Sequence, residues 1–226
     1  MGVIDQSMLL LDLDGVVVFE AEPPLAGATE LILLHENLDS ALAGLGLPVV
    51  VLTHRSRREA WRILQAAGLD AAPLAGVIAA EDLVIAGFRY APKRMFKHGL
   101  RKDLALSVLE HSFGVDRSRI AFIDDRIDNL QDLLAAGLGL AIHAPSYLTM
   151  DRRFLMTFNI SDALASIQSW DRSARQSTIV GLSPRPLATS LWCRTGVSTR
   201  PYRRHVFNVA RRMGNFMRLV FLERLL

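Results

Sequence analysis

The chain has 226 residues, of which half are hydrophobic and 22% are charged, so we expect a folded domain with a proper core. Its single cysteine, Cys193, excludes an internal disulfide and a multi-cysteine metal site, and the net charge is a modest +3. No apolar run approaches the roughly 20 residues of a membrane-spanning helix, and the first residues lack a signal-peptide pattern, so we expect a cytoplasmic protein.

Short apolar runs alternate with helical segments over the first two thirds of the chain. The runs that read as buried strands are Met8–Leu11, Pro48–Leu52, Gly76–Ala79, Arg119–Ile123 and Leu138–Ile142. The segments expected to be helical are 26–45, Ser56–Ala67, Lys102–Ser112 and Asp128–Ala136. Because the strands are apolar throughout and alternate with helices, the expected fold class is α/β, with a doubly wound parallel sheet covered on both faces.

Polar residues stand directly after three of these strands. Asp12 and Asp14 follow the first strand, Thr53 follows the second, and Asp124 and Asp125 close the fourth. Parallel sheets bind ligands at the carboxyl ends of their strands, near a topological switch point. Neighbouring carboxylates repel each other unless a cation or a shared proton offsets their charge, and Mg²⁺ is the usual cation where phosphate is the substrate. The sequence therefore predicts a magnesium site at this edge.

The order and spacing of these residues resemble the haloacid dehalogenase (HAD) superfamily. Residues 12–16, Asp-Leu-Asp-Gly-Val, resemble its first motif, and the strand ending at Thr53 resembles the second. Lys102 can serve as the lysine of the third motif, with Lys97 as the alternative. Asp124 and Asp125, with Asn129 four residues beyond the pair, resemble the fourth. The resemblance covers residues 8–143 and implies a HAD-like Rossmannoid domain.

The resemblance also implies a reaction, which is Mg²⁺-dependent hydrolysis of a phosphomonoester through an aspartyl-phosphate. Asp12 would be the nucleophile, and Asp14 would protonate the leaving oxygen and then activate water. Lys102 would neutralise charge on the nucleophile and the phosphoryl group, and the hydroxyl of Thr53 and backbone amides would bind phosphoryl oxygens. The metal would be held by Asp12, the backbone carbonyl of Asp14 and Asp125, with Asp124 behind them. The candidate substrate-binding residues are Gly15, Thr53, His54 and Arg55, although His54 either contacts the substrate or fills the loop.

The spacing of the motifs leaves little room for a cap domain. A flap around Phe19–Gly27 fits between the first two motifs, and about twenty residues before Lys102 are too few for a large cap. By family analogy, an open site suits a phosphorylated substrate such as a nucleotide, a nucleic-acid end or a phosphoprotein. The alternative function is a non-catalytic binding protein of the same fold, whose basic C-terminal segment engages nucleic acid, membrane or a protein partner.

The last quarter of the chain differs in charge from the rest. Residues 1–170 hold 15 Lys and Arg against 21 Asp and Glu, whereas residues 171–226 hold 11 Arg against two acids. We expect a catalytic domain over 1–170, a linker or arm rich in Ser, Thr, Gly and Pro over 171–201, and a basic amphipathic helix over 202–226. Its apolar stripe would dock on the domain or form a homo-oligomer, with an anionic membrane or nucleic acid as alternatives.

Overall fold

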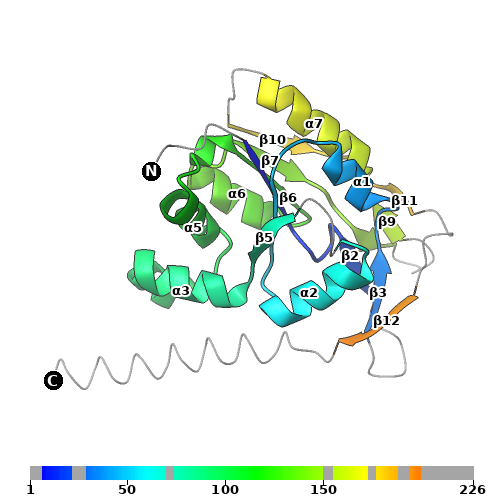
Figure 1. The fold of residues 1–226 in the computed structure, drawn as a ribbon, viewed down its shortest axis with the longest axis horizontal. Helices are drawn as coiled ribbons and strands as arrows, with labels where there is room; N and C mark the ends of the chain where they lie inside the picture. Colours follow the sequence, from blue (N-terminus) through cyan, green and yellow to red (C-terminus); the bar gives the residue numbers. More distant parts are fainter. Residues whose placement is uncertain are drawn as a thin grey trace.

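The computed structural model describes residues 7–21, 29–69, 74–149, 155–172, 177–187 and 194–199. Six parallel strands form its main sheet, in the order β10-β7-β6-β1-β4-β5 (Figure 1). Their bounds are β1 Met8–Leu11, β4 Val49–Leu52, β5 Leu74–Ile78, β6 Ile120–Asp124, β7 Leu140–His143 and β10 Thr178–Gly181. The five strands expected from the sequence are all present, which confirms the doubly wound parallel sheet.

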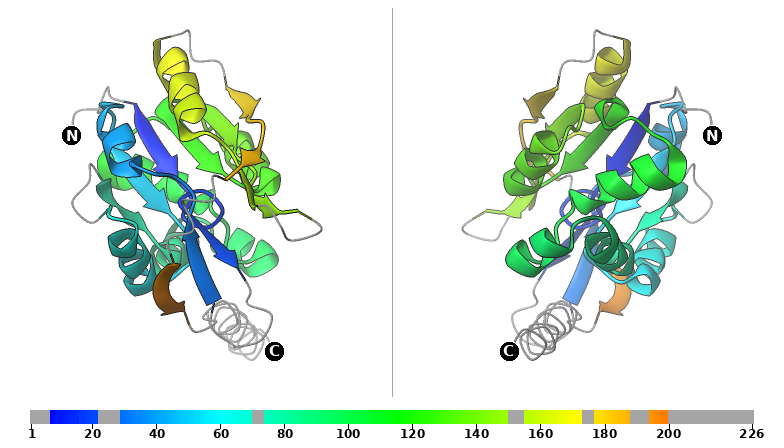
Figure 2. Two further views of the ribbon diagram at one scale, coloured as in Figure 1. Left: turned by 90° about the vertical axis from the view of Figure 1, so that its right-hand side faces the viewer. Right: turned by 90° about the vertical axis from the view of Figure 1, so that its left-hand side faces the viewer.

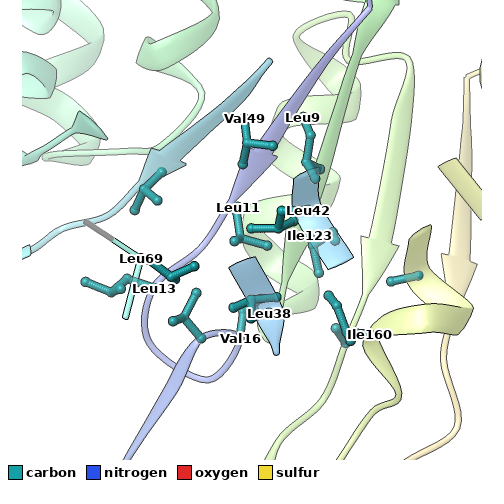
Figure 3. Packing of buried hydrophobic residues seen from close by; sticks show 14 of the residues in the cluster. Leu9, Leu11, Leu13, Val16, Leu38, Leu42, Val49, Leu69, Ile123 and Ile160 are labelled. Carbon is teal, nitrogen blue, oxygen red and sulfur yellow. The ribbon is translucent and has the colours of Figure 1, made fainter. Parts of the chain in front are cut away.

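Helices cover both faces of this sheet (Figure 2). One face packs against α1 Leu38–Ala43, α2 Arg57–Ala66 and α7 Ile160–Arg172. The other packs against α3 Ala80–Tyr90, α5 Leu104–Phe113 and α6 Ile127–Ala135, with α4 Pro92–His98 beside α3. Successive side chains of β1 point to opposite faces of the sheet. Leu9 and Leu11 pack on the side of α1, α2 and α7 (Figure 3), while Met8 and Leu10 pack on the side of α3, α5 and α6. Burial on both sides explains the uninterrupted apolar run.

An antiparallel hairpin follows β1 in the chain. It consists of β2 Val18–Ala21 and β3 Thr29–Leu33, and β12 Arg194–Thr199 pairs with β3 on its other side. The expectation of helix over residues 26–45 is therefore wrong for its first part, because pairing with two neighbours makes 29–33 a strand. The hairpin occupies the place of the expected flap, whose residues 22–28 lie outside the described ranges.

The main sheet extends past the boundary expected at residue 170. Within the segment expected as a linker or arm, β10 pairs with β7, β12 pairs with β3, and β11 Arg185–Pro186 pairs with β9 Leu155–Thr157. The remaining strand, β8 Tyr147–Leu148, pairs with β9. The helix expected over 202–226 lies outside the described residues. Among the residues that are described, no helix has the length and apolar character needed to cross a membrane.

The order of the strands places a switch point at the centre of the sheet. The chain runs from β1 outward through β4 to β5, then returns to β6 on the other side of β1. The carboxyl ends of β4, β1 and β6 are therefore neighbours, and they lead into Thr53, Asp12 and Asp124. Ligands of open α/β sheets bind at this kind of edge.

Candidate active site

A buried lysine joins two of the strand-end carboxylates. The Nζ atom of Lys102 lies 2.6 Å from Oδ2 of Asp12 and 2.7 Å from Oδ2 of Asp124. All three side chains are buried. Burial alone would lower the pKa of Lys102, but the two carboxylates raise it above its ordinary value, so the ammonium stays charged. Lys97, by contrast, is exposed on α4.

Asp124 is fully engaged by protein groups. Its Oδ1 accepts a hydrogen bond from the backbone N–H of Arg126 at 2.7 Å, and Nδ2 of Asn129 lies 3.1 and 2.9 Å from its two oxygens. Lys102 completes the set. With these contacts Asp124 fixes the position of Lys102 and the start of α6.

Three carboxylates converge in a way that suits a divalent cation. Asp12, Asp124 and Asp125 each offer one oxygen, and these oxygens lie within 4.8 Å of one another. Burial raises the pKa of Asp12 well above its usual range, and burial followed by the charge of Asp124 raises the pKa of Asp125 to about 6. A bound cation would offset this repulsion. Hard oxygen donors fit Mg²⁺, while the expected role of the Asp14 carbonyl stays a prediction.

The loop after β4 presents Thr53 and His54. Thr53 is buried, and its Oγ1 accepts a hydrogen bond from the Arg55 N–H at 3.1 Å. The Nε2 atom of His54 is buried without a hydrogen-bond partner in the described part of the chain. Burial and the charge of Lys102 lower the pKa of His54 to about 4, so the ring is neutral at neutral pH. Any contact it makes with an anion is therefore a hydrogen bond and not a charge pair.

Arg55 and Asp14 lie together, beside two acids that sequence reasoning did not place in the site. The Arg55 side chain contacts Asp14, Glu20 of β2 and Glu59 of α2. Glu59 stands three residues after Ser56, which is the spacing of a capping box, and Ser56 accepts a hydrogen bond from the Glu59 N–H at 3.3 Å. The Glu59 carboxylate, however, forms an ion pair with Arg55. No local sequence pattern identifies Glu20 as a residue of the site.

The motif residues thus meet as the resemblance implies, with Asp12, Thr53 and Asp124 at neighbouring strand ends and Lys102 between two of the carboxylates. Their order and their meeting at one edge of the sheet resemble the HAD superfamily. No protein-family model and no curated protein matches this sequence.

Several solved HAD structures resemble the chain at low identity. A Mesorhizobium loti protein assigned to the HAD-like phosphatases is 20% identical with a TM-score of 0.47, over 75% of this chain and 90% of that one. A HAD-superfamily hydrolase from Geobacter sulfurreducens is 21% identical with a TM-score of 0.43, over 61% and 89%. The 3-deoxy-D-manno-octulosonate 8-phosphate phosphatase of Moraxella catarrhalis, solved with magnesium and phosphate ions, is 18% identical with a TM-score of 0.39, over 61% and 67%. With TM-scores below 0.5, these likenesses do not establish a function for this chain.

Gly15 leaves room for the Asp125 carboxylate in the acidic cluster. A Cβ atom added at Gly15 would lie 2.3 Å from Oδ2 of Asp125, and the φ angle of +79° disfavours any other residue. We expect Gly15→Ala to displace the Asp125 carboxylate and weaken Mg²⁺ binding by about 10–100-fold. Calorimetric titration with Mg²⁺ measures this.

Gly46 provides the matched control for that substitution. Its φ angle of +70° is similar, but nothing lies within 4 Å of an added Cβ. Gly46→Ala therefore carries the backbone strain without the clash, and it should leave Mg²⁺ affinity unchanged. Equal Mg²⁺ affinity in both variants would show that Gly15 is not needed to seat Asp125.

Proposed function

We propose that this protein is a Mg²⁺-dependent phosphomonoester hydrolase that forms an aspartyl-phosphate at Asp12. The contact between buried Asp12 and Lys102, beside two further carboxylates, carries the proposal. A carboxylate that attacks a phosphoryl group brings two anions together, so the site must neutralise charge. Lys102 supplies one positive charge, and Asp12 and Asp125 would supply ligands for a cation, with Asp124 behind them.

The first displacement would transfer the phosphoryl group to Asp12. Oδ1 of Asp12 accepts the Leu13 N–H at 2.7 Å and Oδ2 faces Lys102, so the carboxylate is held by both oxygens. As the bond from Asp12 to phosphorus forms, the bond from phosphorus to the leaving oxygen breaks, and Asp14 gives that oxygen a proton. In the second displacement, water attacks phosphorus and Asp14 takes its proton, while the bond from Asp12 to phosphorus breaks, which releases inorganic phosphate and regenerates the Asp12 carboxylate.

Asp12 and Asp125 would hold the cation, with Asp124 behind them. When bound, Mg²⁺ supplies charge neutralisation between the nucleophile and the phosphoryl oxygens. Thr53 and the neutral His54 lie at the neighbouring strand end, where each would donate a hydrogen bond to a phosphoryl oxygen. The hairpin of β2 and β3 stands in the place of a flap, which is compatible with a substrate as large as a nucleotide, a nucleic-acid end or a phosphoprotein.

Hydrolysis of phosphomonoesters with and without metal tests the proposal. We expect turnover of an aryl phosphate, a nucleotide or a phosphopeptide in Mg²⁺, and a fall of at least about 10²-fold after chelation, because the metal stabilises charge in the transition state. Restoring Mg²⁺ should restore turnover, which separates metal removal from denaturation. Turnover that is indifferent to chelation would contradict the metal's role. Absence of turnover across the panel would favour the non-catalytic binding protein.

A further inference from the structure

The Arg55 guanidinium is buried and bonded to three carboxylates. Its Nε lies 2.9 and 3.0 Å from the two oxygens of Asp14, and its Nη2 lies 2.6 Å from Asp14 Oδ1. Nη2 also lies 2.7 Å from Glu20, and Nη1 lies 2.5 Å from Glu59. The side chain is only 6% exposed. Each nitrogen is therefore already occupied, and little of the group is open to a ligand.

The charges around Arg55 keep it in place. Burial alone would lower the pKa of Arg55, but the hydrogen bonds and charge of Asp14, and then the charges of Glu59 and Glu20, raise it above the ordinary value. Three acids surround one permanently charged base. If the Arg55 side chain moved away, these carboxylates would remain close together without a positive charge to offset them. The ion-paired arrangement is thus the favoured position of the side chain.

The backbone of Arg55 is also fixed. Its N–H donates to Oγ1 of Thr53 at 3.1 Å, and its carbonyl accepts the N–H of Ala80 at 3.0 Å. Ser56 then caps α2. From this anchored position at the end of β4, the side chain crosses to the loop after the neighbouring strand β1, where Asp14 lies.

We propose that Arg55 is a positioning residue that holds the Asp14 carboxylate in place for proton transfer, and that Glu20 and Glu59 hold Arg55 in turn. The role rests on the proposed function, in which Asp14 exchanges protons with the leaving oxygen and water. Asp14 lies outside the cluster formed by Asp12, Asp124 and Asp125. A guanidinium that contacts both oxygens of a carboxylate fixes its plane as well as its distance, and proton transfer depends on that geometry.

Arg55→Lys separates positioning from substrate binding. Lysine keeps the charge but loses the fork that grips both oxygens of Asp14. We expect kcat to fall about 10²-fold while KM stays nearly constant, because misplacement of a reacting group lowers the rate and not the binding of substrate.

Arg117→Lys is the matched control. Arg117 also forms hydrogen bonds through three nitrogens, to Glu110 and the Ala136 carbonyl, but it precedes β6 at the opposite end of the sheet. It should change neither constant. A raised KM with unchanged kcat in Arg55→Lys would overturn the proposal and make Arg55 a substrate ligand.

A double-variant comparison shows whether Arg55 acts through Asp14. If it does, adding Arg55→Lys to Asp14→Asn should cause no further loss of kcat beyond that of Asp14→Asn alone. A further loss of about 10²-fold would overturn the role, since independent effects multiply. Should Arg55→Lys fail to fold, Glu59→Gln removes one support of Arg55 and should give a smaller fall in kcat that again vanishes beside Asp14→Asn. An additive effect of Glu59→Gln would equally overturn it.

The outcome for the wild type distinguishes the two proposals. Absence of wild-type turnover on the phosphomonoester panel would remove the hydrolase function and the role of Arg55 with it. Wild-type turnover together with an effect of Arg55→Lys confined to KM would remove the role of Arg55 alone.

Discussion

Replacing Lys102 with methionine should abolish turnover and lower the free energy of unfolding by about 3–5 kcal/mol, the cost of breaking a buried charge pair by removing one partner. Lys102 lies between Asp12 and Asp124, and both carboxylates are buried. Without the ammonium, Asp12 and Asp124 lose the positive charge that the described part of the chain places between them, next to Asp125. Urea unfolding and kcat report the two effects. Mg²⁺ should restore part of the lost stability in the variant, because a bound cation offsets the same charges.

Lys97→Met is the control for that experiment. Lys97 is exposed on α4, and its loss should change stability and turnover little. The pair of variants also decides between the two lysines that the sequence left open. If Lys97→Met eliminated turnover while Lys102→Met retained it, Lys102 would lose its place in the site.

Asp12→Asn should lower kcat by about 10⁴-fold or more, the scale seen when a covalent nucleophile is removed. The amide is nearly isosteric with the carboxylate, and its oxygen can still accept the Leu13 N–H that now bonds to Asp12 Oδ1. The far-ultraviolet circular dichroism spectrum should therefore match that of the wild type. Steady-state kinetics at saturating substrate measure the loss of kcat.

Asp128→Asn gives the matched change of charge outside the cluster. Asp128 is 76% exposed on α6, near Arg126. This variant should keep wild-type kcat within about twofold, as surface substitutions generally do. Comparable activity in Asp12→Asn and Asp128→Asn would remove Asp12 as the nucleophile.

The central part of the fold could be predicted because its strands carry a strong local signal. Residues 8–11 and 49–52 are apolar at every position, and both faces of the sheet are buried, so pattern and structure agree. The polar residues that break these runs then mark the strand ends. Since parallel strands bring their carboxyl ends to one edge, the sequence alone predicts that Asp12, Thr53 and Asp124 lie together.

The remainder depends on pairings that the local sequence does not encode. Strand β10 is largely exposed at the edge of the sheet, so no buried apolar run marks it. Residues 29–33 contain good helix formers and become a strand because β2 and β12 pair with them. The contact of Arg55 with Glu20 joins residues 35 apart in the chain, and its geometry arises only when β2 folds back beside the site.

Detection of a phosphoryl group on Asp12 tests the central claim most directly. The wild type would be mixed with excess aryl phosphate and Mg²⁺, quenched in acid within the first turnover, and digested for mass spectrometry. A covalent intermediate predicts a phosphoryl adduct on the peptide that contains Asp12, labile to hydroxylamine as acyl phosphates are, and its absence in Asp12→Asn. Rapid wild-type turnover with no adduct at any quench time, or an adduct on another residue, would contradict Asp12 as the group that accepts the phosphoryl.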